Sequence, residues 1–108
     1  MLKRGDVVLI PFPFSDLSGQ KIRPALIISK QNKKDDVVVL FITSRNKSKL
    51  SLTVPVMASS QNGLKVPSLV VCDKIATLDK KTIIGSIGRL EEKVQNAVDN
   101  AIIKVLGL

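Results

Sequence analysis

The sequence contains no histidine, no tryptophan and no tyrosine, and it has a single cysteine. The absence of histidine excludes histidine acid–base catalysis and histidine metal ligation. A lone cysteine, Cys72, excludes an intramolecular disulfide and a cysteine zinc site, and it suits a reducing cytosol. Three phenylalanines are the only aromatic residues, which argues against a nucleic-acid-binding surface built from stacked bases.

Acidic residues are also few, since 9 Asp and Glu stand against 17 Lys and Arg, a net charge of +8. The carboxylates are scattered along the chain, so we expect no metal site, no cofactor and no metal-dependent catalysis. The sequence has no glycine-rich phosphate-binding motif of a nucleotide-driven enzyme. The excess positive charge indicates a polyanionic partner, either nucleic acid or an acidic protein, although a merely soluble basic protein has the same composition.

No apolar run approaches the roughly 18–20 residues that span a bilayer. Charged residues interrupt the N-terminus at Lys3, Arg4 and Asp6. We therefore expect a soluble, cytoplasmic protein with no signal peptide and no membrane association. With 108 residues and no repeat or linker, residues 1–108 are predicted to form a single domain.

Short apolar runs separated by turn formers predict a mainly β fold. The first expected strands are residues 7–10, ended by Pro11, residues 25–29, begun by Pro24, and residues 37–42, buried on both faces. Residues 52–56 are expected to form an edge strand because of Pro55, and residues 68–72 form another strand. The last expected strand is 82–87, in which Gly85 permits a bulge or a close approach. Residues 13–21 are rich in turn formers and are expected to form a flexible loop.

The end of the chain is predicted to be a helix. From Leu90 to Leu106 the apolar residues recur with helical spacing, Glu91 and Glu92 occupy the first turn, and Gly107 can cap the end. Several short strands followed by one packed helix predict a small, curled antiparallel β-barrel with a C-terminal helix.

One reaction suits this limited set of side chains, namely cleavage of RNA by its own 2′-hydroxyl. The substrate then supplies the nucleophile, and the protein needs an arginine for the phosphate, a hydroxyl donor and a carboxylate base. Arg23, Thr43 and Asp73 each occur beside a predicted strand. Each also has a purely structural interpretation, as a surface charge, a strand-end β-former and a turn residue. Composition and spacing alone leave both interpretations open.

Four ordered blocks cover nearly the whole chain: RGDVVLI, KIRPALIIS, FITS and VVCDKIATLDKKTIIGSIGRL. Together they resemble the MazF/PemK/Kid family of type II toxin–antitoxin toxins. The resemblance implies an SH3-like barrel, a homodimer, and sequence-specific, metal-independent cleavage of single-stranded RNA that leaves a 2′,3′-cyclic phosphate and a 5′-hydroxyl. It also implies a cognate acidic, MazE-like antitoxin, with operator DNA bound only through that antitoxin.

The resemblance assigns roles to individual residues. Arg23 would stabilise the transition state, Thr43 would hold a non-bridging oxygen, and Asp73 would take the 2′-proton or orient Arg23. Kid-like members carry an arginine, proposed as the general acid, where this chain has Val71. Arg23, Lys74 or water must then protonate the leaving oxygen. The expected RNA contacts are Gln20, Lys21, Ser44, Arg45, Lys47 and Lys74.

Two other functions share this expected fold. CcdB-like toxins of the same barrel family inhibit DNA gyrase without cutting RNA, but they lack the block around Arg23 and the block around Thr43. A degenerate family member would only bind RNA or repress transcription. The presence of both blocks favours the nuclease over either alternative.

Overall fold

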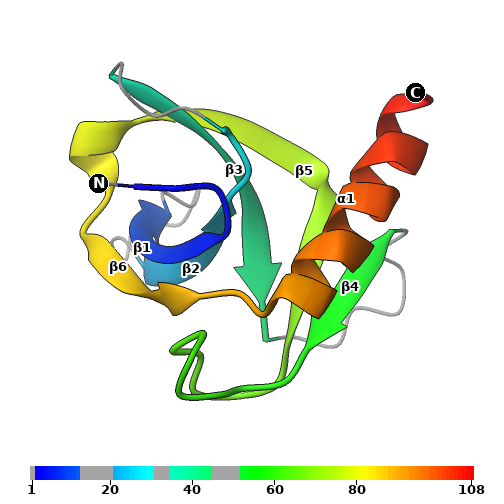
Figure 1. Cartoon of the computed structure of the whole chain (residues 1–108). Coiled ribbons are helices and arrows are strands. Elements are labelled where there is room, and N and C mark those ends of the chain that lie inside the picture. The colour runs from blue at the N-terminus through cyan, green and yellow to red at the C-terminus, as the bar shows by residue number, and fades with distance from the viewer. Residues whose placement is uncertain (1, 13–20, 31–34, 45–51) are drawn as a thin grey trace.

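The computed structural model describes residues 2–12, 21–30, 35–44 and 52–108, which form a curled sheet and one C-terminal helix (Figure 1). The elements are β1 (Asp6–Phe12), β2 (Lys21–Ile27), β3 (Asp36–Thr43), β4 (Thr53–Val56), β5 (Ser68–Asp79), the 3-10 turn η1 (Lys80–Thr82), β6 (Gly85–Arg89) and α1 (Glu92–Leu106). The strand order is β4-β5-β3-β2-β1-β6, and every neighbouring pair is antiparallel. The predicted fold class is confirmed.

Two apolar clusters lie on opposite faces of the curled sheet, because alternate residues of a strand point to opposite sides. The first includes Val7, Leu26, Leu40, Ile42, Val70 and, from α1, Val98. The second includes Val8, Ile10, Ala25, Ile27, Val37 and Val39. β3 contributes to both clusters, which confirms that this strand is buried on both faces.

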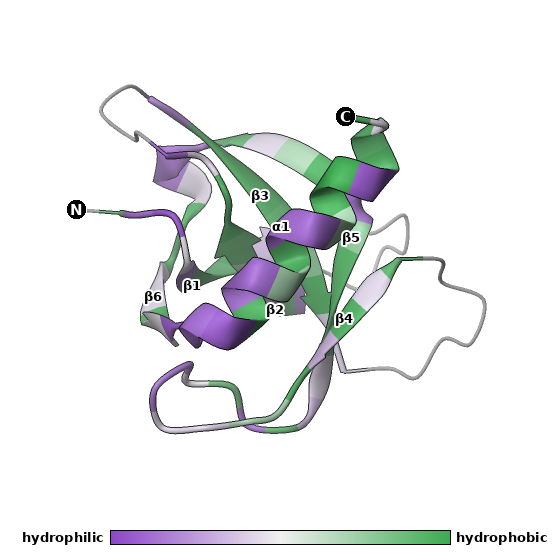
Figure 2. Cartoon of the chain, turned by 45° about the vertical axis from the view of Figure 1, so that its right-hand side comes forward, coloured by the Kyte–Doolittle hydropathy of each residue, from purple (hydrophilic) through white to green (hydrophobic). Residues whose placement is uncertain are grey.

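α1 covers the first of these clusters and packs against β4 and β5 (Figures 1 and 2). In Figure 2 the outer face of α1 is largely hydrophilic, and β3 and β5 behind it are largely hydrophobic. Gly107 ends the helix in a left-handed conformation, as predicted. An ion pair between Arg4 and Asp99 ties α1 to the start of the chain, and Arg4 also donates to the carbonyl of Ile28. No helix among the described residues is long and apolar enough to cross a membrane.

β5 is longer than predicted, since it continues for twelve residues instead of ending at Cys72. Its pairing with β3 shifts between Leu40, which faces Ile75, and Phe41, which faces Val71. The residues between Val71 and Ile75 therefore form a bulge. A bulge interrupts the hydrophobic pattern of a strand but not the strand itself. The exposed Asp73 and Lys74 therefore resemble the end of a strand in the sequence, although β5 continues through them.

Pro11 and Pro24 lie inside strands, although the sequence predicts them at strand ends. Pro11 belongs to β1, and β6 pairs with β1 only as far as Leu9, so on that side no neighbouring strand requires a backbone N–H from Pro11. Pro24 belongs to β2, whose pairing with β3 starts at the next residue. Pro55 does lie on an edge strand, as predicted.

The last expected strand is also displaced. Residues 80–82 form η1, and β6 runs from Gly85 to Arg89. The irregular pairing of β6 skips Ile87 and not Gly85, since Ser86 faces Val8 and Gly88 faces Val7. A Cβ atom at Gly85 would meet nothing within 4 Å. The close approach expected at Gly85 occurs instead at Gly63 and Gly88.

Residues 57–67, which join β4 to β5, fold against β6. Gly63 has φ +75°, and a Cβ atom there would lie 2.1 Å from the carbonyl oxygen of Ile87. The backbone N–H of Arg89 donates to the carbonyl of Gln61 at 2.8 Å. This segment is consequently held close to the sheet by backbone contacts that leave no room for a side chain at Gly63.

Replacing Gly63 by alanine should therefore destabilise the fold. The left-handed conformation alone costs roughly 1–2 kcal/mol for a residue with a Cβ atom, and the overlap with Ile87 adds to this. Gly85→Ala is the matched control and should change the free energy of unfolding by less than about 0.5 kcal/mol. Urea denaturation of both variants checks this, and equal midpoints would contradict the packing described for residues 57–67.

Candidate active site

A cleft of about 410 Å³ opens where the start of β2 and the end of β3 meet residues 63–66. Two kinds of side chain line it. The polar ones are Lys21, Arg23, Ser44, Lys65 and Ser68, and the apolar ones include Leu9, Ile22, Pro24, Ile42, Leu64, Val66 and Ile87. Three cations and no carboxylate are among these lining residues, so the cleft favours an anionic ligand.

Arg23 and Thr43 lie at the same level of neighbouring strands. Ala25 of β2 faces Phe41 of β3, and continuing this register by two residues places Arg23 opposite Thr43. Residues directly opposite in a sheet point to the same face. Both residues are half-buried, and the Nε atom of Arg23 is fully buried, which restricts the guanidinium to few orientations. Arg23 lines the cleft, whereas Thr43 is not among the described residues that line it, although its neighbours Ile42 and Ser44 are.

Asp73 and Lys74 lie elsewhere, on the exposed bulge of β5. Leu69 is the β5 residue that faces Thr43, and Asp73 comes four residues further along the strand. Neither Asp73 nor Lys74 lines the cleft. Val71, which stands where Kid-like toxins have an arginine, is 3% exposed. Asp73 is therefore, like Thr43, not among the described residues that line the cleft, whereas Arg23 is.

The remaining predicted RNA contacts divide into two groups. Lys21 and Ser44 are exposed and line the cleft. Gln20, Arg45 and Lys47 lie outside the described residues. Ser44 and Ser68 also border a second hollow of about 300 Å³, lined further by Pro55, Val56, Met57, Pro67 and Leu69. The cleft therefore continues past Ser44 into a largely apolar space.

Cys72 is not a nucleophile in this fold. It is fully buried in the first cluster, and burial, followed by the charge of Asp73, raises the pKa of the thiol to about 11. The thiol stays protonated at neutral pH, whereas the thiolate is the reactive species. Among the described residues no three carboxylates or thiols gather where they could hold a metal ion.

Lys65 is a cleft residue that sequence reasoning missed. It belongs to the segment 57–67, which lies between two predicted strands and carried no assigned role. The pair Asn62–Gly63 just before it is a turn signal, but it does not reveal which part of the sheet the turn contacts. Only the packing against β6 brings this lysine to the cleft that contains Arg23.

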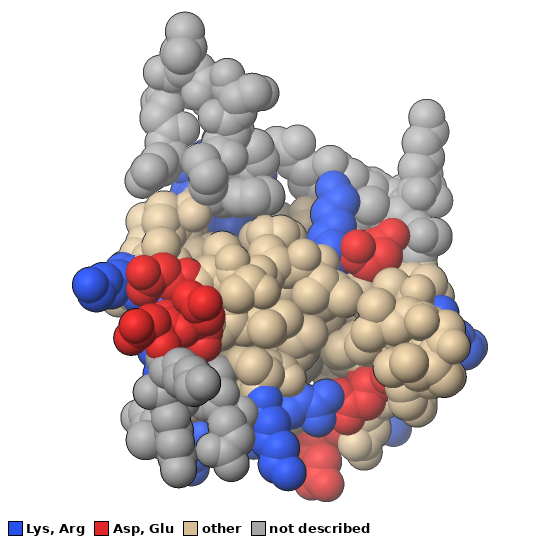
Figure 3. Space-filling view, turned by 90° about the horizontal axis from the view of Figure 1, so that it is seen from above, with Lys and Arg blue, Asp and Glu red and all other residues tan. Residues whose placement is uncertain are grey.

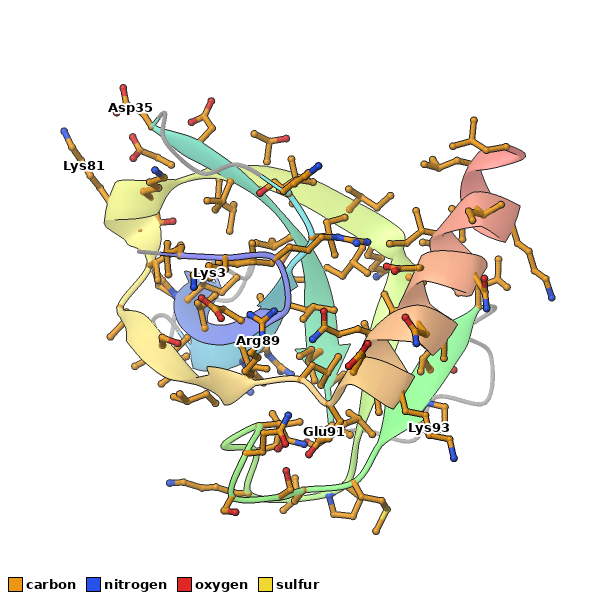
Figure 4. The ribbon with its side chains drawn as sticks, in the orientation of Figure 1. Lys3, Asp35, Lys81, Arg89, Glu91 and Lys93 are labelled. Carbon is orange, nitrogen blue, oxygen red and sulfur yellow. The ribbon has the colours of Figure 1, made fainter. Side chains whose placement is uncertain are left out.

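The buried side chain of Asn62 organises that segment. Its amide oxygen accepts from the N–H groups of Ser59 and Leu64, at 3.1 and 2.9 Å, and its amide nitrogen donates to the carbonyl of Met57 at 2.9 Å. The same nitrogen donates to Glu91 at 3.0 Å, and the hydroxyl of Ser59 donates to the other oxygen of that carboxylate. Figure 4 shows Glu91 at the start of α1, beside the loop that joins β4 to β5.

Charge is distributed unevenly over the molecule. Seen from above, acidic and basic side chains are interspersed around a largely uncharged centre (Figure 3). The described residues that line the cleft, by contrast, are all basic or neutral. A local group of cations beside two hydroxyls suits a phosphate or another anionic group.

Residues 3–106 match the family model described as PemK-like, MazF-like toxin of type II toxin–antitoxin system. This chain belongs to that family. The predicted resemblance to the MazF/PemK toxins is thereby confirmed.

Individual members of the family are similar over their full length. The endoribonuclease MazF of Staphylococcus saprophyticus is 36% identical over 115 residues, which cover 100% of this chain and 93% of that protein. The Mycobacterium tuberculosis toxin MazF-mt6 superposes with a TM-score of 0.78 at 27% identity, over 95% of this chain and 97% of its own. A mycobacterial endoribonuclease, solved in complex with its cognate antitoxin, superposes with a TM-score of 0.77 at 26% identity, over 100% and 97%.

This MazF-like chain should lose stability in acid through Glu91. Hydrogen bonds from Ser59 and, to a smaller extent, Asn62 lower the pKa of Glu91 below its ordinary value of 4.5. A carboxylate with a depressed folded-state pKa contributes stability above its unfolded pKa, and this contribution disappears as the pH falls through the folded value.

Glu91→Gln should accordingly lower the unfolding midpoint at pH 7, and its difference from wild type should shrink below about pH 4. Glu92→Gln removes the same charge from an exposed position next to it and is the control. Urea denaturation at pH 7 and pH 3 compares the three proteins. A Glu91→Gln effect that is independent of pH, or equal to that of Glu92→Gln, would contradict this network.

Proposed function

We propose that this toxin is an endoribonuclease that cuts single-stranded RNA without a metal ion, by attack of the RNA's own 2′-hydroxyl. The observation that carries the proposal is the cleft in which Arg23 lies with Lys21 and Lys65, at the same level as Thr43 on the next strand. The family assignment and the name of the staphylococcal relative support it. We place this activity in the cytoplasm, where messenger RNA is accessible.

The proposed chemistry follows from the charge that develops on the phosphate. The attacked phosphorus gains a fifth oxygen and extra negative charge, and Arg23 offers a planar fork of donors that stays charged at any working pH. The hydroxyl of Thr43 donates to a non-bridging oxygen. Loss of the 5′-oxygen leaves a 2′,3′-cyclic phosphate, and that oxygen takes its proton from Arg23, Lys74 or water.

Asp73 has two proposed roles, either as the base that takes the 2′-proton or as a residue that orients Arg23. It lies on the bulge of β5 and is not among the described residues that line the cleft. We propose a homodimer as the working form, because a groove shared by two chains gives each cleft a second source of a carboxylate. The remaining proposed partners are a cognate acidic antitoxin, which competes for the same basic cleft, and operator DNA, reached only through that antitoxin.

The nuclease mechanism requires that cleavage persist in excess EDTA and leave a 2′,3′-cyclic phosphate and a 5′-hydroxyl. Arg23→Ala should slow cleavage by about 10²–10³, the usual loss for one preorganised charge stabiliser, and Thr43→Val should cost less, because a neutral hydroxyl is a weaker donor. Gel analysis of RNA fragments checks both. Loss of activity in EDTA, or cleavage of RNA carrying 2′-deoxyribose at the cut site, would overturn the mechanism.

Asp73→Asn separates two roles for the carboxylate. If Asp73 is the base, cleavage falls by about 10²–10⁴ and the acidic limb of the pH–rate profile disappears. If it only orients another group, the rate falls mildly and the profile keeps its shape. Asp79→Asn, at the far end of the same strand, is the control and should leave both the rate and the profile unchanged.

A further inference from the structure

We propose that Lys65 binds a phosphate of the RNA and that the cleft therefore has two basic walls. Arg23 and Lys21 form one wall from β2, and Lys65 forms the other from the segment between β4 and β5. This inference rests on the proposed RNA-cleaving function and names a contact that holds the substrate rather than one that drives the chemistry.

The backbone that carries Lys65 is held in place before any ligand arrives. The preceding residue, Leu64, is 8% exposed, and its N–H donates to the buried amide of Asn62 at 2.9 Å. The N–H of Gly63 donates to the carbonyl of Ser59 at 3.0 Å. Asn62 in turn is bound to Glu91 at the start of α1. Hydrogen bonds of the preceding residues thus fix the backbone at Lys65, whereas the Lys65 side chain is exposed.

The charge of Lys65 is also available to a ligand. The ion pairs Arg4–Asp99 and Arg89–Asp6 do not involve Lys65. Among the described residues that line this cleft there is no carboxylate. A flexible ammonium group on a rigid backbone suits a phosphate, which it contacts as a point charge and without reading the base.

A phosphate next to the cut one is the group that Lys65 would contact. Arg23, which lines the cleft from β2, and Thr43, on the next strand, are the residues proposed above to act on the phosphate that is attacked. The RNA strand must then continue out of the cleft. The second hollow, which has Ser44 and Ser68 in common with the cleft, offers a path along residues 55–57 and 67–69. Lys65 lines the first of these spaces, and Ser68, three residues further along the chain, borders both.

The test measures binding of a short RNA that contains a site cut by the wild-type protein and has 2′-O-methylribose at that site, so that it stays intact. Lys65→Ala should weaken binding about tenfold and reduce the slope of log affinity against log salt by roughly 0.7. Lys65→Arg should retain most of the affinity. Lys104→Ala, on the exposed side of α1, removes the same net charge and should change neither quantity measurably.

Neutral methylphosphonate linkages, placed one at a time, identify the phosphate. One linkage should weaken binding by wild type and by Lys104→Ala about tenfold, yet leave the affinity of Lys65→Ala unchanged. Thermal midpoints equal to wild type show that these surface variants are folded. If every linkage affects Lys65→Ala and wild type alike, Lys65 contacts no phosphate and this inference is overturned while the nuclease stands. If the wild-type protein cuts no RNA, the proposed function fails and this inference fails with it.

Discussion

The cleft depends on one buried amide. Asn62 is fully buried, and a buried amide that lost its partners would cost roughly 1–3 kcal/mol. Its four hydrogen bonds connect the end of β4, the turn at Gly63 and the first residues of α1. These bonds hold the segment 57–67 against β6. In this position its residues 63–66 line the cleft on the side opposite β2.

The same constraint links stability to function. Glu91 precedes α1 but makes no capping bond to the helix, since its carboxylate is used by Ser59 and Asn62. The start of the helix is thus bound to residues that lie 29 and 32 positions earlier in the chain. These residues belong to the segment 57–67, which also carries Lys65, so the start of α1 and one side of the cleft share a hydrogen-bond network.

The chemistry assigned to this cleft needs little from the protein. The substrate carries its own nucleophile, and charge stabilisation in a partly buried site is worth more than the same charge in water. An arginine and two lysines suit the holding of a phosphodiester, and the proposed mechanism adds a hydroxyl donor and a carboxylate base. A chain without histidine and with few carboxylates is well matched to this reaction and poorly matched to metal-dependent hydrolysis.

The sequence by itself determined the fold class, the terminal helix, the doubly buried strand β3 and, through its four blocks, the family. These follow from local pattern: the spacing of apolar residues is set by strand and helix geometry, and blocks such as KIRPALIIS keep their order along the chain. Tertiary structure alone decided the rest. Pro11 and Pro24 are tolerated inside strands because the neighbouring ladders stop beside them, and β5 continues through exposed residues because β3 still pairs with it beyond the bulge. Lys65 enters the cleft, and Asp73 stays outside it, because position depends on strand order and on the bonds of Asn62, which join residues that are distant in the sequence.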